Sequence, residues 1–186
     1  MGILNRIVQS TAPWMPKIVI GRIASVYVAG DKLEDGIDLV RKLNKKGFVG
    51  TLDLLGEEVK NRRGITKTTN SYCDLIDGIA NSGVDCNISL KLTAIGLKVD
   101  ESLCWDNLSV ILDKAITYIS FVRMDMEDSE VTESTIQMCK KAVNYYSNCG
   151  TVLQAYMYRT SDDIDLLKGP NTNIRLCKGA YKESKD

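Results

Sequence analysis

The chain has 186 residues, in which 24 Lys+Arg balance 24 Asp+Glu, and it contains no histidine. Its 44% hydrophobic and 26% charged fractions are typical of a globular domain, and the zero net charge argues against a nucleic-acid-binding protein. The missing histidine excludes Ser-His-Asp and Cys-His catalysis and histidine-ligated metal sites. The six cysteines occur without a C-x-x-C pair, so we expect no metal site and reduced thiols in a cytosol-like compartment.

Residues 1–47 are expected to form a helical extension ahead of the domain at 48–186. Residues 1–30 carry basic side chains but no acid, and a helical extension docked on the domain is favoured over a targeting peptide. Asp31 is a candidate N-cap, and Gly47 follows two lysines as a stop signal. The helix between them has apolar residues three or four positions apart: Leu33, Ile37, Val40 and Leu43.

Beyond Gly47, short apolar runs alternate with amphipathic segments. The spacing predicts strands at 48–55, 87–95, 121–126, 151–158 and 173–180, joined by helices. Gly83 closes the first of these helices, while Thr132 and Ser161 are candidate N-caps of the last two. The predicted buried helix faces are Tyr72, Leu75, Ile76 and Ile79; then Leu108, Ile111, Leu112, Ala115, Ile116 and Ile119; then Ile136, Cys139, Val143 and Tyr146.

Repeated strand–helix units predict right-handed crossovers and a parallel sheet. Two α/β architectures fit, an open doubly wound sheet and a (β/α)8 TIM-type barrel. Neither G-x-G-x-x-G nor a Walker sequence is present, which removes the usual nucleotide signatures of the open sheet. A polar residue falls late in every predicted strand, as in a barrel that builds its active site at the carboxyl ends: Asp53, Lys91, Asp125, Gln154 and Lys178.

Residues 48–186 hold five of these strands, so each βα unit takes about 28 residues and eight units would take about 220. We therefore expect an incomplete barrel of about five βα units. Its first and fifth strands would present unpaired edges unless something covers them.

Charged residues inside this sheet need partners. Lys91 is either a buried site lysine or a strand-end lysine that reaches solvent. Arg123, Asp125 and Glu127 share one face of the third strand, where Lys91 and Lys178 are available to the acids. The alternative interpretation is a structural ion-pair network in the barrel interior.

Gln154, Tyr156 and Tyr158 share one face of the fourth strand. An amide beside phenols suits a planar heterocycle, which takes edge hydrogen bonds and aromatic contact. The small-residue turn at 178–180 would let the backbone approach a phosphate closely.

Five motifs occur in order: a T-L-D-L-L-G-E-like segment, S-L-K-L-T, R-M-D-M-E-D, L-Q-A-Y-M-Y-R and R-L-C-K-G-A-Y-K-E. With them the chain strongly resembles the proline dehydrogenases, from about Tyr27 to its last residue. The resemblance implies a distorted (β/α)8 barrel that holds FAD non-covalently. It further implies that L-proline is oxidised to 1-pyrroline-5-carboxylate, with electrons passed to a quinone at a peripheral contact with the respiratory membrane.

Position by position, the resemblance implies that Lys91 contacts the substrate carboxylate, that Asp125 is an active-site acid, and that Arg175 lies close to the reacting edge of the flavin. It also implies five FAD contacts: Met126, Gln154, Lys178, Gly179 and Ala180.

The family completes its barrel with further strands and a last helix, whose Tyr and paired Arg grip the proline carboxylate. These residues are not among the 186, so we expect little or no activity from this chain alone. Two alternatives stay open. One is a Schiff-base lyase or aldolase that uses Lys91 or Lys178; the other is a non-catalytic half-barrel that assembles with a separate C-terminal piece.

Overall fold

The protein is described here by a computed structural model, which covers residues 28–56, 58–118, 120–169, 172–181 and 183. The helices expected within residues 1–27 lie outside this range. The helices are α3 (Leu33–Asn44), α4 (Arg62–Ser82), the 3-10 helix η2 (Leu92–Ile95), α5 (Glu101–Thr117), α6 (Ser129–Tyr145) and α7 (Thr160–Leu166). The strands are β1 (Gly50–Leu52), β2 (Cys86–Leu90), β3 (Val122–Met124), β4 (Cys149–Gln154) and β5 (Asn173–Cys177).

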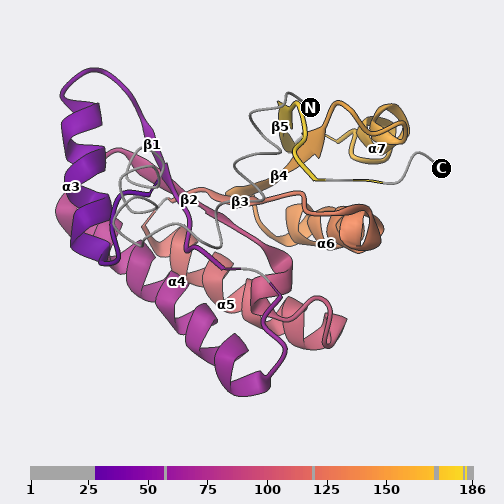
Figure 1. Cartoon of the computed structure of the whole chain (residues 1–186), viewed down its shortest axis with the longest axis horizontal. Helices are drawn as coiled ribbons and strands as arrows, with labels where there is room; N and C mark the ends of the chain where they lie inside the picture. Colours follow the sequence, from indigo (N-terminus) through magenta and orange to yellow (C-terminus); the bar gives the residue numbers. More distant parts are fainter. Residues whose placement is uncertain (1–27, 57, 119, 170–171, 182, 184–186) are drawn as a thin grey trace, which may run out of the picture.

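The five strands form one sheet in the order β1-β2-β3-β4-β5, and every neighbouring pair is parallel. Each strand therefore pairs with the next strand in the sequence, and the order never reverses. A doubly wound sheet would reverse at a switch point, so that alternative is wrong and the barrel-type arrangement is confirmed. Figure 1 shows α4, α5 and α6 along one side of the sheet.

Helix α4 illustrates how local sequence sets the boundaries of an element. The side chain of Asn61 accepts a hydrogen bond of 2.8 Å from the Gly64 amide and caps the start. Gly83 ends the helix with a φ of 65°, which favours glycine. The predicted face of Tyr72, Leu75, Ile76 and Ile79 is buried. These residues join a core formed with β2, β3, α5 and α6.

Three predicted N-caps are wrong. Lys32, Asp128 and Arg159 stand at the N-cap positions of α3, α6 and α7, in place of Asp31, Thr132 and Ser161. At α6 the reason is visible, because Asp128 accepts a hydrogen bond from the Glu130 amide. Its carboxylate satisfies an otherwise free helical N–H one turn before the predicted cap.

The observed strands are shorter than predicted, because the chain turns as soon as it leaves the carboxyl edge of the sheet. After β2, residues 92–95 form η2 instead of continuing the strand, and after β4 the chain turns at 155–158. In α5, Ile116 is 46% exposed, which contradicts its predicted burial. Ile119 lies outside the described residues. The division at residue 47 stays a prediction.

The core lies between the sheet and the helices that cover one side of it. Fully buried side chains from β2, β3, α5 and α6 pack together here, among them Ile88, Met124, Leu108, Leu112 and Ile136. No helix in the described part of the chain is long and apolar enough to span a bilayer.

Candidate active site

The polar residues that were predicted at the strand ends lie along the carboxyl edge of the sheet. Asp53, Lys91, Asp125 and Lys178 each follow the last residue of a strand, and Gln154 is the last residue of β4. A cavity of about 330 Å³ opens beside them. Its lining includes these residues predicted for the site: Lys91, Asp125, Met126, Gln154, Arg175, Gly179 and Ala180. Lys178 is exposed and stands outside that lining.

Lys91 is held by an ion pair at the carboxyl ends of β1 and β2. Its Nζ lies 2.6 Å from Oδ2 of Asp53. The other oxygen of Asp53 accepts a 2.8 Å hydrogen bond from the hydroxyl of Tyr72, a fully buried residue of α4. Asp53, which the sequence marked only as a strand-end polar residue, is therefore part of the site.

Asp125 is paired with Arg175, a partner that the sequence did not suggest. Oδ1 of Asp125 accepts a 2.8 Å hydrogen bond from Nη2 of Arg175. Burial raises the pKa of Asp125 above its ordinary value, and the charge of Asp53 adds to this. Ser89, Arg175 and Lys91 act in the opposite direction. The site therefore contains a partly desolvated acid flanked by two cations.

Arg123, on the same face of β3, is a structural residue in this arrangement. Its guanidinium donates 3.2 Å and 3.0 Å hydrogen bonds to the Thr151 carbonyl and the Asn173 side chain. It also lies 4.8 Å from the centre of the Phe121 ring. Burial and the nearby Arg175 lower the pKa of Arg123. The guanidinium thus ties β3 to β4 and β5.

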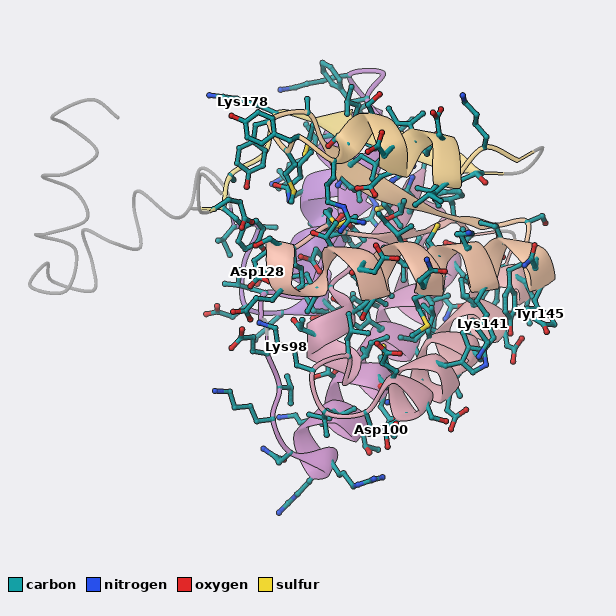
Figure 2. The ribbon with its side chains drawn as sticks, turned by 90° about the vertical axis from the view of Figure 1, so that its right-hand side faces the viewer. Lys98, Asp100, Asp128, Lys141, Tyr145 and Lys178 are labelled. Atoms are coloured by element: carbon teal, nitrogen blue, oxygen red, sulfur yellow. The ribbon has the colours of Figure 1, made fainter. Side chains whose placement is uncertain are left out.

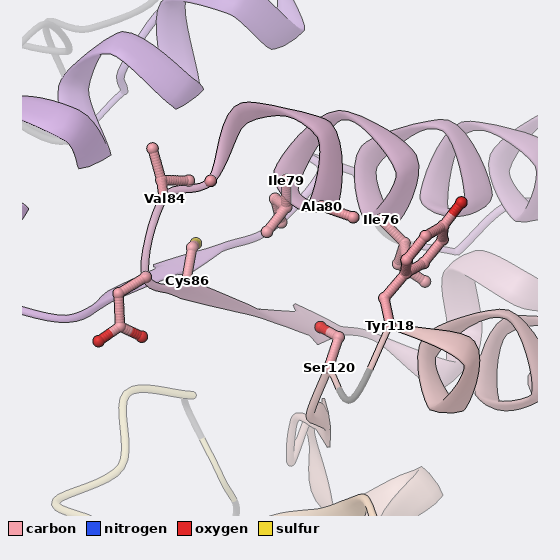
Figure 3. Close-up of a pocket in the computed structure, with 9 residues that line it drawn as sticks. Ile76, Ile79, Ala80, Val84, Cys86, Tyr118 and Ser120 are labelled. Atoms are coloured by element: carbon pink, nitrogen blue, oxygen red, sulfur yellow. The ribbon is translucent and has the colours of Figure 1, made fainter.

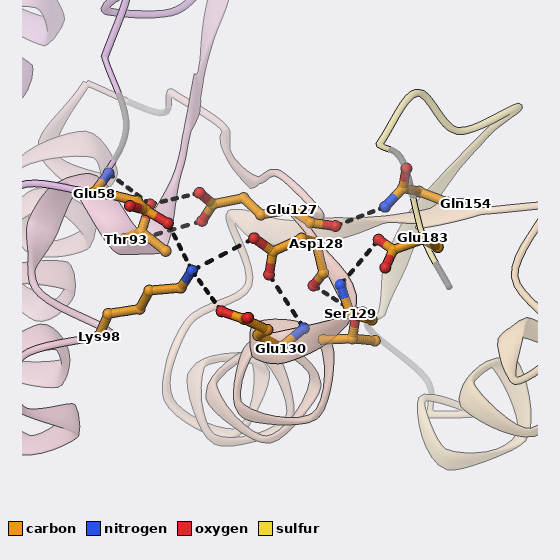
Figure 4. Close-up of polar contacts among 10 residues, drawn as sticks. Glu58, Thr93, Lys98, Glu127, Asp128, Ser129, Glu130, Gln154 and Glu183 are labelled. Atoms are coloured by element: carbon orange, nitrogen blue, oxygen red, sulfur yellow. Dashed lines mark hydrogen bonds and ion pairs between the residues drawn. The ribbon is translucent and has the colours of Figure 1, made fainter. Parts of the chain in front are cut away.

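Glu127 is a buried residue that follows the site residues Asp125 and Met126 in the chain. Its carboxylate accepts hydrogen bonds from the backbone amide and the hydroxyl of Thr93, and Figure 4 shows these contacts. The Thr93 hydroxyl also accepts a 3.1 Å hydrogen bond from the Glu58 amide. Three successive βα loops are thereby joined. The sequence identified Glu127 as charged but gave no indication of Thr93 as its partner.

Gln154 has both ends of its amide engaged. Nε2 donates a 2.8 Å hydrogen bond to the Glu127 carbonyl, and Oε1 accepts a 3.3 Å hydrogen bond from the Ala180 amide. The hydroxyl of Thr160 binds the Gln154 carbonyl. The amide plane is consequently fixed at the cavity wall before any ligand arrives.

The expected aromatic face of β4 is wrong, because the chain turns after Gln154. Tyr158 is 94% exposed. Tyr156 instead supports the 178–181 segment: its hydroxyl donates a 3.0 Å hydrogen bond to the Tyr181 carbonyl. A Cβ on Gly179 would come 2.0 Å from the Tyr156 ring, and the φ of Gly179 is +102°. Only glycine fits both conditions.

Figure 2 shows Lys98, Asp128 and Lys178 on one side, while Lys141 and Tyr145 lie at the opposite end of α6. A second cavity, of about 320 Å³, lies where β2 begins and is drawn in Figure 3. Cys86 is in its lining, and burial raises the pKa of this thiol to about 11. The thiol therefore stays protonated and unreactive at neutral pH.

The chain is similar to proteins of one family. A family model described as "Proline dehydrogenase" matches residues 37–185. "Proline dehydrogenase 1" of Bacillus subtilis subsp. natto is 38% identical over 158 residues, which are 85% of this chain and 52% of that protein. "Proline dehydrogenase 2" of the same organism is 36% identical over 183 residues, or 98% of this chain and 58% of that protein. The chain thus spans about half the length of these relatives.

Solved structures agree on the fold. Proline utilization A (PutA) from Bdellovibrio bacteriovorus aligns with a TM-score of 0.78 at 22% identity, over 85% of this chain and 20% of that one. PutA from Corynebacterium freiburgense aligns with a TM-score of 0.70 at 22% identity, over 95% and 20%. Within the described residues, no group of three or more Cys, Asp or Glu residues is placed to hold a metal ion.

Proposed function

Because the chain belongs to the proline dehydrogenase family, we propose that its carboxyl-edge cavity takes part in oxidising L-proline to 1-pyrroline-5-carboxylate with FAD as cofactor. The proposal is carried by one observation: the cavity collects Lys91, the Asp125–Arg175 pair and the Gln154 amide at adjacent strand ends. Two cations beside a small cavity suit a substrate that carries a carboxylate.

The lining of the cavity fits a flavin. Met126 and Val152 supply apolar surface, while the fixed amide of Gln154 and the guanidinium of Arg175 supply edge groups. The Gly179 backbone passes so close to Tyr156 that a side chain would fill the space. Gln154, Met126, Gly179 and Ala180 would hold the group, with Lys178 beside its phosphate arm. Bound FAD would supply the hydride acceptor, which no amino-acid side chain provides.

The remaining residues would orient the substrate. Lys91 has three N–H donors, and Asp53 takes one of them. Lys91 also lines the cavity, where its positive charge would attract the carboxylate of the substrate. Asp125 stands between Lys91 and Arg175, where its charge would face the substrate amine and balance the two cations.

A Schiff-base lyase fits the geometry less well. An amine must lose its proton before it attacks a carbonyl. The 2.6 Å contact between Lys91 and Asp53 favours the charged ammonium. Trapping with borohydride and a carbonyl compound is therefore expected to leave Lys91 unmodified.

The proposal includes the fate of the electrons after proline has been oxidised. Electrons would pass to a quinone, and a peripheral contact with the respiratory membrane would give access to that acceptor. Family membership supports both statements. Assembly with a separately encoded C-terminal piece remains compatible with a chain that spans about half the length of its relatives.

Single-turnover flavin reduction tests the proposal. The full chain is loaded with FAD, made anaerobic and mixed with L-proline, and the flavin absorbance is followed over minutes because steady-state turnover is expected to be low. We expect bleaching with L-proline and none with D-proline. Tightly bound FAD that L-proline does not bleach would contradict the substrate, while failure to bind FAD would contradict the cofactor.

A further inference from the structure

Tyr72 reaches the active site from inside the core. The residue lies in the middle of α4, its side chain has no exposed surface, and its ring packs within the main hydrophobic cluster. Its hydroxyl is directed at the carboxyl end of β1, where it donates a 2.8 Å hydrogen bond to Oδ1 of Asp53. A phenylalanine would fill the same core volume, so packing alone does not account for the hydroxyl.

The two oxygens of Asp53 have different partners. Oδ1 accepts from Tyr72 and Oδ2 lies 2.6 Å from Nζ of Lys91. A carboxylate held at one oxygen cannot turn freely about its Cβ–Cγ bond, so the second oxygen stays directed at Lys91. We call this chain of contacts, Tyr72 to Asp53 to Lys91, the relay. It connects helix α4 to a cation that lines the cavity.

We infer that Tyr72 is a positioning residue, which acts through Asp53 to hold the Lys91 ammonium where it meets the substrate carboxylate. The inference rests on the proposed function for the role of Lys91. Tyr72 is not among the residues that line the cavity. It fixes the direction of the Lys91 ammonium and takes no part in the chemistry.

The hydroxyl keeps its proton over the working range of pH. Burial raises the pKa of Tyr72 well above its ordinary value, and the charge of Asp53 raises it further. A backbone hydrogen bond involving Leu54 opposes this effect only in part. Tyr72 is consequently a permanent donor, so the relay should not switch off near neutral pH.

Tyr72→Phe removes the hydroxyl and retains the ring. Tyr146→Phe is the matched control, because the Tyr146 hydroxyl also donates to an aspartate, Asp113, at 2.9 Å, where α6 ends. Asp53→Asn serves as the second variant and breaks the ion pair directly. Circular dichroism and urea unfolding establish that each variant is folded.

The first readout needs no catalysis. Acetic anhydride labelling of Lys91, quantified by peptide mass spectrometry, reports how firmly the ammonium is held. We expect Tyr72→Phe to label about three- to tenfold faster than wild type, the range that corresponds to one lost hydrogen bond. Asp53→Asn should label at least as fast, and Tyr146→Phe should match wild type. A wild-type rate in Tyr72→Phe, with a faster rate in Asp53→Asn, would overturn the inference.

The second readout uses proline and a double-mutant cycle. Tyr72→Phe should raise KM about three- to tenfold with kcat nearly unchanged, and it should have no further effect when Lys91 is already methionine. An equal effect in both backgrounds would show a merely structural tyrosine and would also overturn the inference. If the labelling pattern appears but no form of the protein acts on proline, the relay stands and the proposed function fails.

Discussion

The carboxylate of Asp125 and the guanidinium of Arg175 lie 2.8 Å apart, although 50 residues separate them in the chain. Both β3, which precedes Asp125, and β5, which contains Arg175, pair with β4. The contact therefore crosses the whole width of one strand. It joins an acid and a base at the edge where the cavity opens.

Asp125→Asn is expected to change how stability depends on pH. Burial raises the folded-state pKa of Asp125 above its unfolded value, so the folded state binds the proton more tightly. Its contribution to the free energy of unfolding is then greatest at low pH and falls as pH rises through the folded pKa. The asparagine variant should gain stability relative to wild type as pH rises, measured by urea unfolding between about pH 4 and pH 8.

Arg175→Gln provides the control for that experiment. Arg175 lowers the pKa of Asp125, so its removal should raise that pKa further and extend the pH-dependent loss of stability to higher pH. If the two variants show the same pH profile as wild type, Asp125 is not the group responsible.

Lys91→Met should weaken substrate binding more than catalysis. The variant keeps the apolar stem but removes the charge that is assigned to the substrate carboxylate, so KM for proline should rise about 10- to 100-fold while kcat changes less. Lys114→Met is the control, because Lys114 forms a 2.7 Å ion pair with Asp77 between α5 and α4. Steady-state assays with an artificial electron acceptor over a range of proline concentrations measure both constants. A fall in kcat at constant KM would contradict the assignment.

Gly179→Ala should abolish tight FAD binding. The new Cβ would lie 2.0 Å from the Tyr156 ring, and the alanine would have to adopt a φ of +102°. The 178–181 segment must therefore move away from Gln154. We expect FAD affinity, measured by quenching of flavin fluorescence, to fall by more than about tenfold, as is typical when one close-fitting contact is lost. Gly47→Ala imposes a similar positive φ of +83° with nothing within 4 Å, and it should leave FAD affinity unchanged. An equal loss of FAD affinity in both variants would show that the backbone strain of a positive φ, and not the contact with Tyr156, causes the loss.

Glu127→Gln should destabilise the fold from within the site. Glu127 is 3% exposed, and its two oxygens accept from the amide and the hydroxyl of Thr93. A glutamine could keep one oxygen for the Thr93 amide, but the Thr93 hydroxyl would lose its charged acceptor, at a cost of about 1–3 kcal/mol in unfolding free energy. Glu101→Gln, at an exposed carboxylate that accepts from Ser134, should cost much less. Chemical denaturation measures the unfolding free energy of both variants, and equal losses would contradict this role of Glu127.

Part of the site was accessible from the sequence because parallel strands end at a common edge. Lys91, Asp125 and Gln154 follow apolar runs, so their convergence could be predicted. The ion pairs of Lys91 and Asp125 could not, because their partners Asp53 and Arg175 are 38 and 50 residues away in the chain. The aromatic face expected after Gln154 failed, because the period-two pattern continues through residues that the fold uses as a turn.

The sequence by itself determined the class of the fold and the family. Alternating apolar runs and amphipathic helices dictate a parallel α/β sheet, since each segment must bury its apolar face, and the motifs establish the resemblance to proline dehydrogenases that the family match confirms. Only the tertiary structure decided which charges meet. Pairing depends on strand register and on side-chain direction across the sheet, and a separation of 50 residues between Asp125 and Arg175 becomes 2.8 Å only after β3, β4 and β5 have packed side by side.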